Sequence, residues 1–346
     1  MNPVGRLLQR NQEILARGAR TLWINLPEGY SPGADLASNS EYFFQDYSAF
    51  VNAGGASERR TFGDFPASAA FEYLVLNLPK SKARLAMMVE CLASGMAQQG
   101  RLWLAGENRA GIRSAARVLE SKFEQVEILD KARHCALFEA RRAKVNGEFE
   151  PGDFLTRWSP DLGGFKLEVH SLPGVFAHGR LDEGTALLIE SLETLPAPGR
   201  ILDIACGCGI LGAVLKVLNP DSELVLTDTD ALALSSARET LVANQLRAVV
   251  VGSDGFSEVS GHFDLIVSNP PFHQGFATKH SHGINMLNPV RNFLRPGGQL
   301  LLVVNRHLPY QKWLDQAFGS HEILAENPRY QVLQACKPRT ANRPAR

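Results

Sequence analysis

The residues whose types and spacing could do chemistry gather where one apolar run stops. Residues 263–268 have the composition of a buried strand, and Asn-Pro-Pro-Phe follows directly at 269–272. Two consecutive prolines remove backbone donors and stiffen the chain, and each restricts the residue before it to extended geometry. Because a parallel sheet places ligands beyond the carboxyl ends of its strands, this exit could present an amide, two carbonyls and an aromatic ring to a planar amino group.

Each part of that exit has a role in the transfer of a group to a planar amine. Asn269 Oδ1 and the Pro270 carbonyl would accept the two N–H bonds of the amine and leave its lone pair facing an electrophile. Phe272 would stack on the base that carries the amine. For the motif alone, a strand that ends in a polar turn would be the simpler interpretation, but a second motif upstream argues against it.

A glycine-rich turn follows an earlier apolar run. Residues 200–204 read as a strand, the turn at 206–209 has the sequence Cys-Gly-Cys-Gly, and a helical pattern begins behind it. Glycine permits a tight turn and the close approach of backbone to a ligand. Asp228 ends the next strand, about 20 residues further on, where an acid can meet ribose hydroxyls.

The ligand that these residues favour is S-adenosylmethionine. The glycine spacing differs from the Gly-x-Gly-x-x-Gly that cradles a pyrophosphate. Asp203 lies near the end of the first strand, where a carboxylate is unfavourable beside a phosphate and favourable beside a sulfonium or an amino group. Cys206 and Cys208 could suggest a metal, but no partner cysteines stand at metal-ligand spacing. We therefore expect small residues in a tight turn and no metal site.

The composition limits the class of protein. The length of 346 residues suggests two domains of roughly 150 residues each. The 45% hydrophobic content is enough for packed cores, and the formal net charge of zero gives no bulk attraction to nucleic acid. No apolar run approaches the ~20 residues of a membrane span, and the first residues do not resemble a signal peptide. We therefore expect a soluble cytoplasmic protein.

Apolar runs and helical patterns alternate along the chain, which predicts α/β domains with parallel sheets. There is also an internal repeat, because residues 71–79 align without gaps on 263–271 and residues 20–24 echo 200–204. The alternative is that two buried strands share hydrophobic residues by chance. If the repeat is real, the first half is a degenerate copy that has lost its cofactor site, because it lacks a glycine turn after its first strand. The expected elements are a helix in 1–20, strands at 20–25, 71–76 and 100–106, helices at 82–97, 111–123 and 186–194, and a linker at 141–153.

Residues 150–335 resemble a class I methyltransferase of the kind that methylates amino groups. The whole chain resembles the bacterial small-subunit rRNA (guanine-N2)-methyltransferase C family, RsmC, in the segments 106–115, 172–176, 256–259 and 268–273. The methyltransferase motifs are shared with the related large-subunit guanine-N2 enzyme, and Gly-Glu-Asn-Arg at 106–109 favours the small-subunit family. His178 stands in a loop where similar proteins carry different polar residues.

The resemblance implies two tandem Rossmann-like domains of the class I methyltransferase type, each a seven-stranded, mostly parallel sheet with helices on both faces. Residues 1–145 would be a degenerate domain for RNA docking and structural support, 150–336 the catalytic domain, and 337–346 a basic tail. The reaction implied is S-adenosylmethionine-dependent methylation of the exocyclic N2 amine of a guanine in 16S rRNA, within the assembled 30S subunit. A monomer without membrane contact is expected.

The expected site residues fall into three groups. The catalytic residues are Asn269, Pro270 and Phe272. The cofactor contacts are Asp182, Gly184, Thr185, Asp203, Ala205, Cys206, Gly207, Gly209, Asp228, Asp254 and Asn269. The RNA contacts are Phe272, His273, Arg109 and Arg113, with further candidates in Arg59, Arg60, Lys80, Lys82 and Arg84. We expect the residues of the histidine-rich loop to face RNA or the loop itself and to hold no metal; they are His273, His280 and His282.

Other functions remain open at this point. The Asn-Pro-Pro-Phe motif also suits a large-subunit rRNA guanine-N2 methyltransferase, a DNA adenine enzyme or a protein-glutamine enzyme. A protein-glutamine enzyme would be expected to carry a small helical first domain, whereas residues 1–145 read as α/β. A non-catalytic, RNA-binding assembly factor that retains the cofactor is an interpretation of a different class, and the intact motif at 269–272 argues against it.

Overall fold

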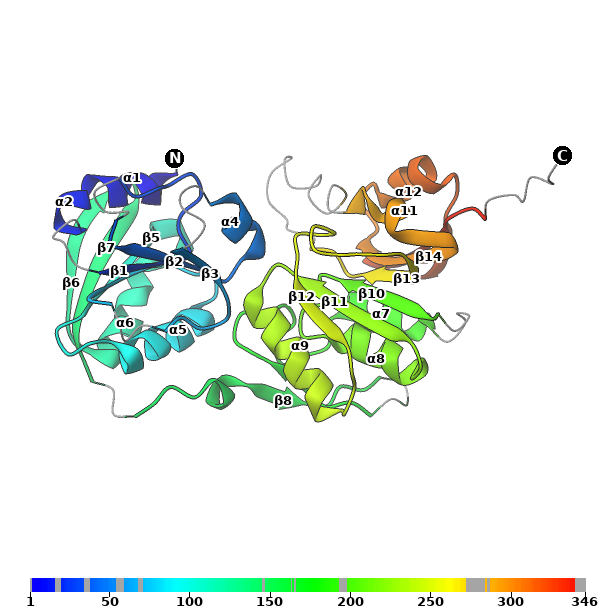
Figure 1. The fold of residues 1–346 in the computed structure, drawn as a ribbon, viewed down its shortest axis with the longest axis horizontal. Coiled ribbons are helices and arrows are strands. Elements are labelled where there is room, and N and C mark those ends of the chain that lie inside the picture. Colours follow the sequence, from blue (N-terminus) through cyan, green and yellow to red (C-terminus); the bar gives the residue numbers. More distant parts are fainter. Residues whose placement is uncertain are drawn as a thin grey trace. The chain divides into compact units, whose positions relative to one another are not determined.

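The computed structural model describes residues 2–15, 20–33, 38–53, 59–67, 71–144, 147–162, 164, 166–192, 198–271, 284 and 287–339. The chain divides into two compact units (Figure 1). Unit 1 comprises Met1–Leu155 with Leu172–Gly174, and unit 2 comprises Thr156–Ser171 with Val175–Arg346. No helix in these described ranges is long and apolar enough to cross a membrane.

Unit 1 is built on a seven-stranded sheet with the order β3-β2-β1-β4-β5-β7-β6. All neighbouring strands are parallel except β7, which runs antiparallel to both β5 and β6. The strands are β1 (Thr21–Ile24), β2 (Ser40–Phe44), β3 (Arg60–Phe62), β4 (Tyr73–Asn77), β5 (Arg101–Glu107), β6 (Phe123–Ala132) and β7 (Cys135–Ala143). The helices are α1 (Pro3–Arg10), α2 (Gln12–Leu15), α4 (Tyr47–Asn52), α5 (Lys82–Gly95) and α6 (Ile112–Lys122).

Alternate residues of the central strands of unit 1 pack on opposite faces of its sheet. Leu74 and Leu76 of β4 lie in a core cluster with residues of α5 and α6. Val75, between them, packs in a second cluster with Leu7 and Leu8 of α1. Because successive side chains of a strand point to opposite faces, a strand covered on both faces reads as a continuous apolar run. The helices accordingly lie on both faces of the sheet (Figure 1).

Unit 2 repeats this plan. Its sheet has the order β12-β11-β10-β13-β14-β16-β15, and β16 runs antiparallel to both of its neighbours. The strands are β10 (Arg200–Ile204), β11 (Glu223–Asp228), β12 (Val249–Gly252), β13 (Phe263–Ser268), β14 (Leu294–Asn305), β15 (Glu322–Glu326) and β16 (Tyr330–Cys336). A separate antiparallel pair, β8 (Thr156–Trp158) and β9 (Val169–Ser171), precedes them.

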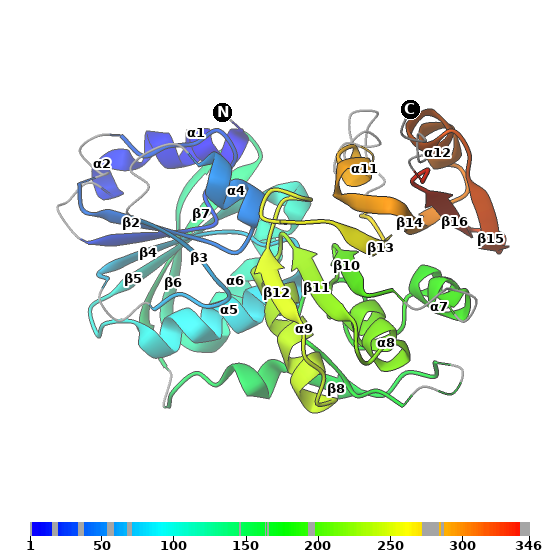
Figure 2. The ribbon, with the colours of Figure 1, turned by 45° about the vertical axis from the view of Figure 1, so that its right-hand side comes forward.

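The helices of unit 2 also cover both faces of its sheet. α7 (Glu183–Glu190), α8 (Ile210–Leu218) and α9 (Ala231–Ala243) lie on one face, and α11 (Val290–Phe293) and α12 (Tyr310–Phe318) on the other (Figure 2). Val290, Tyr310 and Leu314 of the second pair pack with strand residues in one buried cluster. The predicted fold class, with two methyltransferase-type domains, is confirmed.

The two sheets share one strand order, which gives the internal repeat a structural meaning. β4 and β13 hold the same place in their sheets, and so do β1 and β10. Ile24 pairs with Phe43 and Leu76, as Ile204 pairs with Thr227 and Ser268. This register aligns residues 71–79 with 263–271 in space as the sequence repeat does, so chance similarity no longer explains it.

Two predicted boundaries were wrong. The linker predicted at 141–153 begins inside β7, where Arg141 pairs with Arg101 and its guanidinium contacts Glu127 at 2.7 Å. The charged residues at the end of this strand look like a polar linker in the sequence, although β7 extends to Ala143. The helix predicted at 186–194 begins at Glu183, because Asp182 caps it. The predicted start of the tail at 337 directly follows the end of β16 at Cys336, and Lys337 Nζ donates to the Leu294 carbonyl at 2.7 Å; residues 340–346 lie outside the described ranges.

Candidate active site

A pocket lies in unit 2 at the carboxyl ends of its central strands. Seven of the residues expected to contact the cofactor line it: Asp182, Thr185, Asp203, Ala205, Cys206, Gly207 and Asn269. β10 ends at Ile204, directly before the glycine turn, and β13 ends at Ser268, directly before Asn269. The parallel pairing of β10 with β13 therefore brings two motifs 60 residues and more apart in sequence to one edge of the sheet.

The side-chain amide of Asn269 is held in one orientation. Its Nδ2 donates to Asp182 Oδ2 at 3.0 Å and to Thr185 Oγ1 at 2.9 Å. An amide nitrogen has two hydrogens, so both donors are used and Oδ1 faces away from these partners. The assignment of oxygen and nitrogen follows from this hydrogen-bond network. Asn269 therefore offers an acceptor, and not a donor, to a ligand on its other side.

The partners of Asn269 are themselves fixed by the start of α7. Asp182 is the N-cap residue of this helix, and its Oδ2 accepts the Thr185 backbone N–H at 3.0 Å. A capping carboxylate satisfies a backbone donor that has no partner within the helix. The Thr185 side chain is buried. A helix terminus thus positions the amide at the end of a strand.

The exit from β13 is short of donors, as its two prolines require. Ser268 Oγ donates to the Ile204 carbonyl at 2.7 Å and ties the strand end to β10. Pro270 is buried and Pro271 is exposed. Phe272 and His273, expected to contact the base, and His280 and His282 lie outside the described residues.

The glycine turn uses backbone that most residues avoid. Gly207 and Gly209 have φ of 55° and 77°, and Ala205 has φ of 58°. Left-handed backbone costs a non-glycine residue roughly 1–2 kcal/mol, so the turn carries strain at Ala205. Gly209 is the N-cap residue of α8, and a Cβ there would lie 2.9 Å from the Ala237 Cβ. Its missing side chain therefore lets α8 pack closely on α9.

Two carboxylates lie beside the turn. Asp228 Oδ2 accepts the Gly207 N–H at 2.9 Å, and its Oδ1 accepts the Asp230 N–H at 2.9 Å. Burial raises the pKa of Asp228 to about 6, although backbone N–H groups work against the rise. Asp203 is 1% exposed, and burial raises its pKa to about 8 while the Gly212 N–H opposes the rise.

The two carboxyl groups beside the turn favour a ligand that brings a positive charge to them, while Arg180 also lines the pocket. Within the described ranges, no Lys or Arg forms an ion pair with either Asp203 or Asp228. A buried carboxylate is stabilised by an opposite charge nearby. The residues thus fit the sulfonium and amino groups of S-adenosylmethionine, and Asp228 is placed at the strand end where an acid can reach ribose hydroxyls.

The two thiols of the turn are buried. Burial is the largest cause that raises the pKa of Cys206, and it raises the pKa of Cys208 to about 11. Both side chains are therefore neutral thiols at physiological pH. No group of three or more potential ligands in the described part of the chain is arranged to hold a metal ion.

The remaining expected residues, among them Gly209 and Asp228 beside the turn, are not among those that line the pocket. Gly184 lies in α7, where a Cβ would approach the Tyr330 ring to 3.3 Å, so it allows close packing. Asp254 is exposed in the loop after β12, and its backbone N–H donates to Ser257 Oγ at 3.1 Å. Arg109 and Arg113 are exposed residues of unit 1. The contacts expected of these residues stay predictions.

Several pocket residues were not expected from the sequence. The loop before α7 contributes Phe176, Ala177, Arg180 and Leu181. The glycine turn contributes Cys208, and the first turn of α8 contributes Ile210 and Leu211. Phe176 is 60% exposed and lines the pocket. In the sequence, the segment 172–176 is notable only for the family resemblance. The chemical signal that could have found it is an aromatic residue close before a helix cap.

The corresponding site of unit 1 is filled by its own side chains. In register, Asn25 stands where Ala205 stands, with φ of 55°, and Phe44 stands where Asp228 stands. Phe44 is 1% exposed and offers no acceptor to a ribose. Asn25 Oδ1 accepts the Gln45 N–H at 2.8 Å, and Gln45 Nε2 donates to the Asp64 carbonyl at 2.7 Å.

Two family models match the chain. The model described as Methyltransferase small domain matches residues 166–334, and the one described as Methyltransferase small domain N-terminal matches residues 5–158. The two matches follow the division of the chain into two sheets.

Relatives and a solved structure agree with these models. Ribosomal RNA small subunit methyltransferase C of Pseudomonas entomophila (strain L48) is 42% identical over 269 residues, which are 78% of this chain and 80% of the relative. That of Stutzerimonas stutzeri (strain A1501) is 37% identical over 340 residues, 97% of this chain and 100% of the relative. The T. thermophilus 16S rRNA N2 G1207 methyltransferase (RsmC), in complex with AdoMet and guanosine, matches with a TM-score of 0.81 at 25% identity and covers 97% of this chain and 92% of its own. The chain belongs to the ribosomal RNA small subunit methyltransferase C family.

Proposed function

We propose that this protein transfers a methyl group from S-adenosylmethionine to the exocyclic N2 amine of a guanine in 16S rRNA. The observation that carries the proposal is the fixed amide of Asn269, whose Oδ1 is turned away from Asp182 and Thr185 at the edge of the pocket. Membership of the family supports the proposal, as does the related structure in complex with AdoMet and guanosine.

The cofactor would be held by the glycine turn and the two carboxylates. S-adenosylmethionine supplies a methyl group that is activated by its positively charged sulfur. Asp228 would accept the ribose hydroxyls, and Asp203 would balance the positive charge from within the pocket wall. The backbone of Gly207 can approach the ligand closely, because a Cβ at this position would meet nothing within 4 Å.

The protein's part in the transfer is to orient a poor nucleophile. The lone pair of the guanine N2 amine is delocalised into the base, so the amine must be held with this lone pair toward the methyl group. Asn269 Oδ1 and the Pro270 carbonyl would accept its two N–H bonds and stabilise the positive charge that develops on nitrogen. The same contacts align the two reactants. Phe272 would stack on the base, and His273 would lie beside it.

We assign different roles to the two halves of the chain. Residues 150–336 would carry the catalytic site, residues 1–145 would support the fold and dock RNA, and residues 337–346 would add a basic tail. Gly207 and Asp228 lie in residues 150–336, whereas Phe44 and Asn25 fill the matching site of unit 1. Unit 1 therefore offers its surface, and not a second cofactor site.

The RNA-docking role of unit 1 is supported by a basic groove. Arg6 and Arg10 of α1 line a groove of about 510 Å³ together with Arg133 from the turn between β6 and β7. The same turn accepts the Asn108 backbone N–H on the His134 carbonyl at 2.7 Å, which places the segment with Arg109 beside it. Arg109 is 84% exposed, and its guanidinium pairs with Glu107. Exposed cations of this kind bind phosphates without reading sequence.

The physiological substrate would be the assembled 30S subunit, and the enzyme would act on it as a monomer in the cytoplasm. A guanine inside a duplex cannot reach the pocket, so the target base would be exposed or flipped out of its stack. Large-subunit RNA is the alternative substrate within the same chemistry.

Transfer of a labelled methyl group tests the proposed function. The purified full chain is incubated with labelled S-adenosylmethionine and, separately, with 30S subunits, 50S subunits, protein-free 16S rRNA and duplex DNA, all from cells that lack the modification. Label in 30S subunits, recovered as N2-methylguanine from 16S rRNA, supports the proposal. Label found only in 50S subunits or only in DNA would contradict 16S rRNA as the substrate. Cofactor binding without methyl transfer to any acceptor would instead favour a non-catalytic assembly factor.

A further inference from the structure

The loop between β9 and α7 forms one wall of the pocket, and this inference rests on the proposed cofactor site. Phe176, Ala177, Arg180 and Leu181 line the pocket, while His178, in their midst, does not. Ala177 has φ of 54° and Gly179 has φ of 70°. Because left-handed backbone is strained at alanine, the loop needs contacts that hold it in this shape.

His178 supplies those contacts on the side away from the pocket. Its Nδ1 lies 3.0 Å from Ser171 Oγ in β9, and its Nε2 lies 3.2 Å from Thr156 Oγ1 in β8. Ser171 Oγ also accepts the Gly179 backbone N–H at 3.1 Å. One imidazole thus joins the loop to both strands of the small hairpin.

The hydrogen-bond network is complete with a neutral imidazole. Ser171 Oγ and Thr156 Oγ1 can each donate or accept, so either neutral tautomer pairs both ring nitrogens. Burial lowers the pKa of His178, and a hydrogen bond to the Ser171 backbone partly offsets this effect. Both ring nitrogens are therefore satisfied in the form that burial favours.

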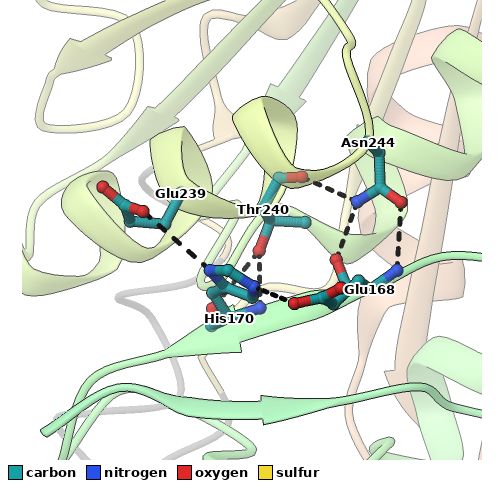
Figure 3. Close-up of polar contacts among 5 residues, drawn as sticks. All are labelled: Glu168, His170, Glu239, Thr240 and Asn244. Atoms are coloured by element: carbon teal, nitrogen blue, oxygen red, sulfur yellow. Dashed lines mark hydrogen bonds and ion pairs between the residues drawn. The ribbon is translucent and has the colours of Figure 1, made fainter. Parts of the chain in front are cut away.

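The hairpin that holds His178 is itself fixed to α9. Asn244 Nδ2 donates to the Glu168 carbonyl at 2.7 Å, and its Oδ1 accepts the Glu168 N–H at 3.0 Å (Figure 3). The His170 N–H donates to Thr240 Oγ1 at 3.0 Å, and the His170 ring lies 2.6 Å from Glu168 Oε1 (Figure 3). The β8–β9 hairpin is therefore hydrogen-bonded to α9 and, through His178, to the loop that lines the pocket.

We propose that His178 is a positioning residue for S-adenosylmethionine, which fixes the wall from Phe176 to Leu181 on the β8–β9 hairpin before the ligand binds. A wall that is already ordered loses less freedom on binding. Without this anchor, only part of the population would hold the binding shape, and the apparent dissociation constant would rise by the inverse of that fraction.

The test replaces His178 with phenylalanine, which fills a similar volume but makes neither hydrogen bond. We expect the dissociation constant for S-adenosylmethionine, measured by calorimetry on the full chain, to rise about tenfold, as if roughly a tenth of the molecules kept the ordered wall. The methylation rate at saturating cofactor should stay within about threefold, because Asn269 and Pro270 are untouched. His178→Asn retains a group near Nδ1 and should restore part of the affinity.

His170 provides a matched control on the same hairpin. His170 is a buried residue of β9, and its contacts are to Glu168 and α9. His170→Phe should lower the melting temperature and leave the dissociation constant for the cofactor within twofold of the unsubstituted protein. If both histidine variants weaken the cofactor equally, the effect is one of general stability and the proposal is wrong.

A second variant guards against a failure of His178→Phe to fold. Thr156→Val removes one hydrogen bond at Nε2 and should weaken cofactor binding severalfold, with no further loss when it is combined with His178→Phe. Unchanged affinity in Thr156→Val and His178→Phe would overturn the inference while leaving the proposed function intact. Failure of the unsubstituted protein to bind S-adenosylmethionine would instead contradict the proposed function itself.

Discussion

Asn269 donates through its amide nitrogen to Asp182 Oδ2 at 3.0 Å, across 87 residues of sequence. Asn269 directly follows a strand, and Asp182 caps a helix. Together with the contact to Thr185, their contact uses both amide hydrogens, so the amide oxygen is the group that Asn269 would turn toward a ligand. A strand end alone would have allowed the amide to turn either way.

The second partner of the amide should matter to the reaction rate. Thr185→Val removes the hydroxyl that accepts from Asn269 at 2.9 Å and keeps the volume of the side chain. A net hydrogen bond contributes about 1 kcal/mol, which corresponds to roughly fivefold in rate. We expect kcat to fall by about this factor in single-turnover methylation.

Thr227→Val is the matched control for this change. The Thr227 hydroxyl is buried and has no hydrogen-bond partner among the described residues. Its replacement should leave kcat unchanged and raise the melting temperature slightly, since an unpaired polar group is removed. Equal rates for the two valine variants would contradict the role given to Thr185.

Asp228 should serve the cofactor and not the RNA. Asp228→Ala removes the acceptor for ribose hydroxyls and also the acceptor for the Gly207 N–H at 2.9 Å. We expect the dissociation constant for S-adenosylmethionine to rise at least tenfold, while 30S binding changes less than twofold. Asp264→Ala, which breaks a 2.8 Å contact with Arg295 at the opposite end of β13, is the control. Unchanged cofactor affinity in Asp228→Ala, measured by calorimetry, would remove this assignment.

We predict that Asp203 lowers the stability of the ligand-free protein at neutral pH and strengthens the binding of S-adenosylmethionine. Burial raises its pKa from 3.8 to about 8, so the folded protein holds this proton more tightly than the unfolded chain does. Its contribution to the free energy of unfolding is therefore largest in acid and is lost as the pH rises from 3.8 toward 8. Asp203→Asn removes the charge and retains an acceptor for the Gly212 N–H.

The measurement for Asp203 is thermal unfolding of the ligand-free protein at two pH values. Asp203→Asn should raise the melting temperature more at pH 8.5 than at pH 5, by about 2–4 °C for each kcal/mol gained in a domain of this size. The same variant should bind S-adenosylmethionine more weakly. An equal gain at both pH values would show that Asp203 is not protonated in the folded protein at neutral pH.

One cofactor should bind per chain. Phe44 and the Asn25–Gln45 contacts fill the place in unit 1 that Asp228 and the glycine turn hold in unit 2. Calorimetric titration of the full chain with S-adenosylmethionine should therefore give a stoichiometry of one. A stoichiometry of two would refute the interpretation of unit 1 as a degenerate copy.

The sequence allowed prediction of those parts of the fold in which local pattern and packing agree. The strands that end at Ile204, Asp228 and Ser268 are buried on both faces, so their apolar runs are continuous. The similarity of residues 71–79 to 263–271 predicted that the two domains share one fold, because corresponding strands bury corresponding residues.

The contacts that could not be predicted depend on topology or on exposed strands. β6 is an edge strand in which charged residues interrupt the apolar ones, and most of its residues are exposed or half-buried, so no continuous apolar run predicts it. The Asn269–Asp182 bond requires α7 to lie beside the end of β13, which no local pattern states. The wall from Phe176 to Leu181 contains no regular element, and His178 orders it through hydroxyl groups that could have faced water.

The measurement that most directly tests the central claim is methylation by Asn269→Ala. Its amide oxygen is proposed to accept from the target amine in the transition state, and loss of one such preorganised group costs about 10²–10³ in kcat. The assay is single-turnover transfer to unmethylated 30S subunits at saturating S-adenosylmethionine, with N2-methylguanine in 16S rRNA quantified by mass spectrometry. Cofactor and 30S affinities, measured separately, should stay within about threefold, because phosphate contacts dominate RNA affinity. We predict a fall in N2-methylation rate of that size; a rate near that of the unsubstituted protein would contradict the role of Asn269 and with it the proposed mechanism.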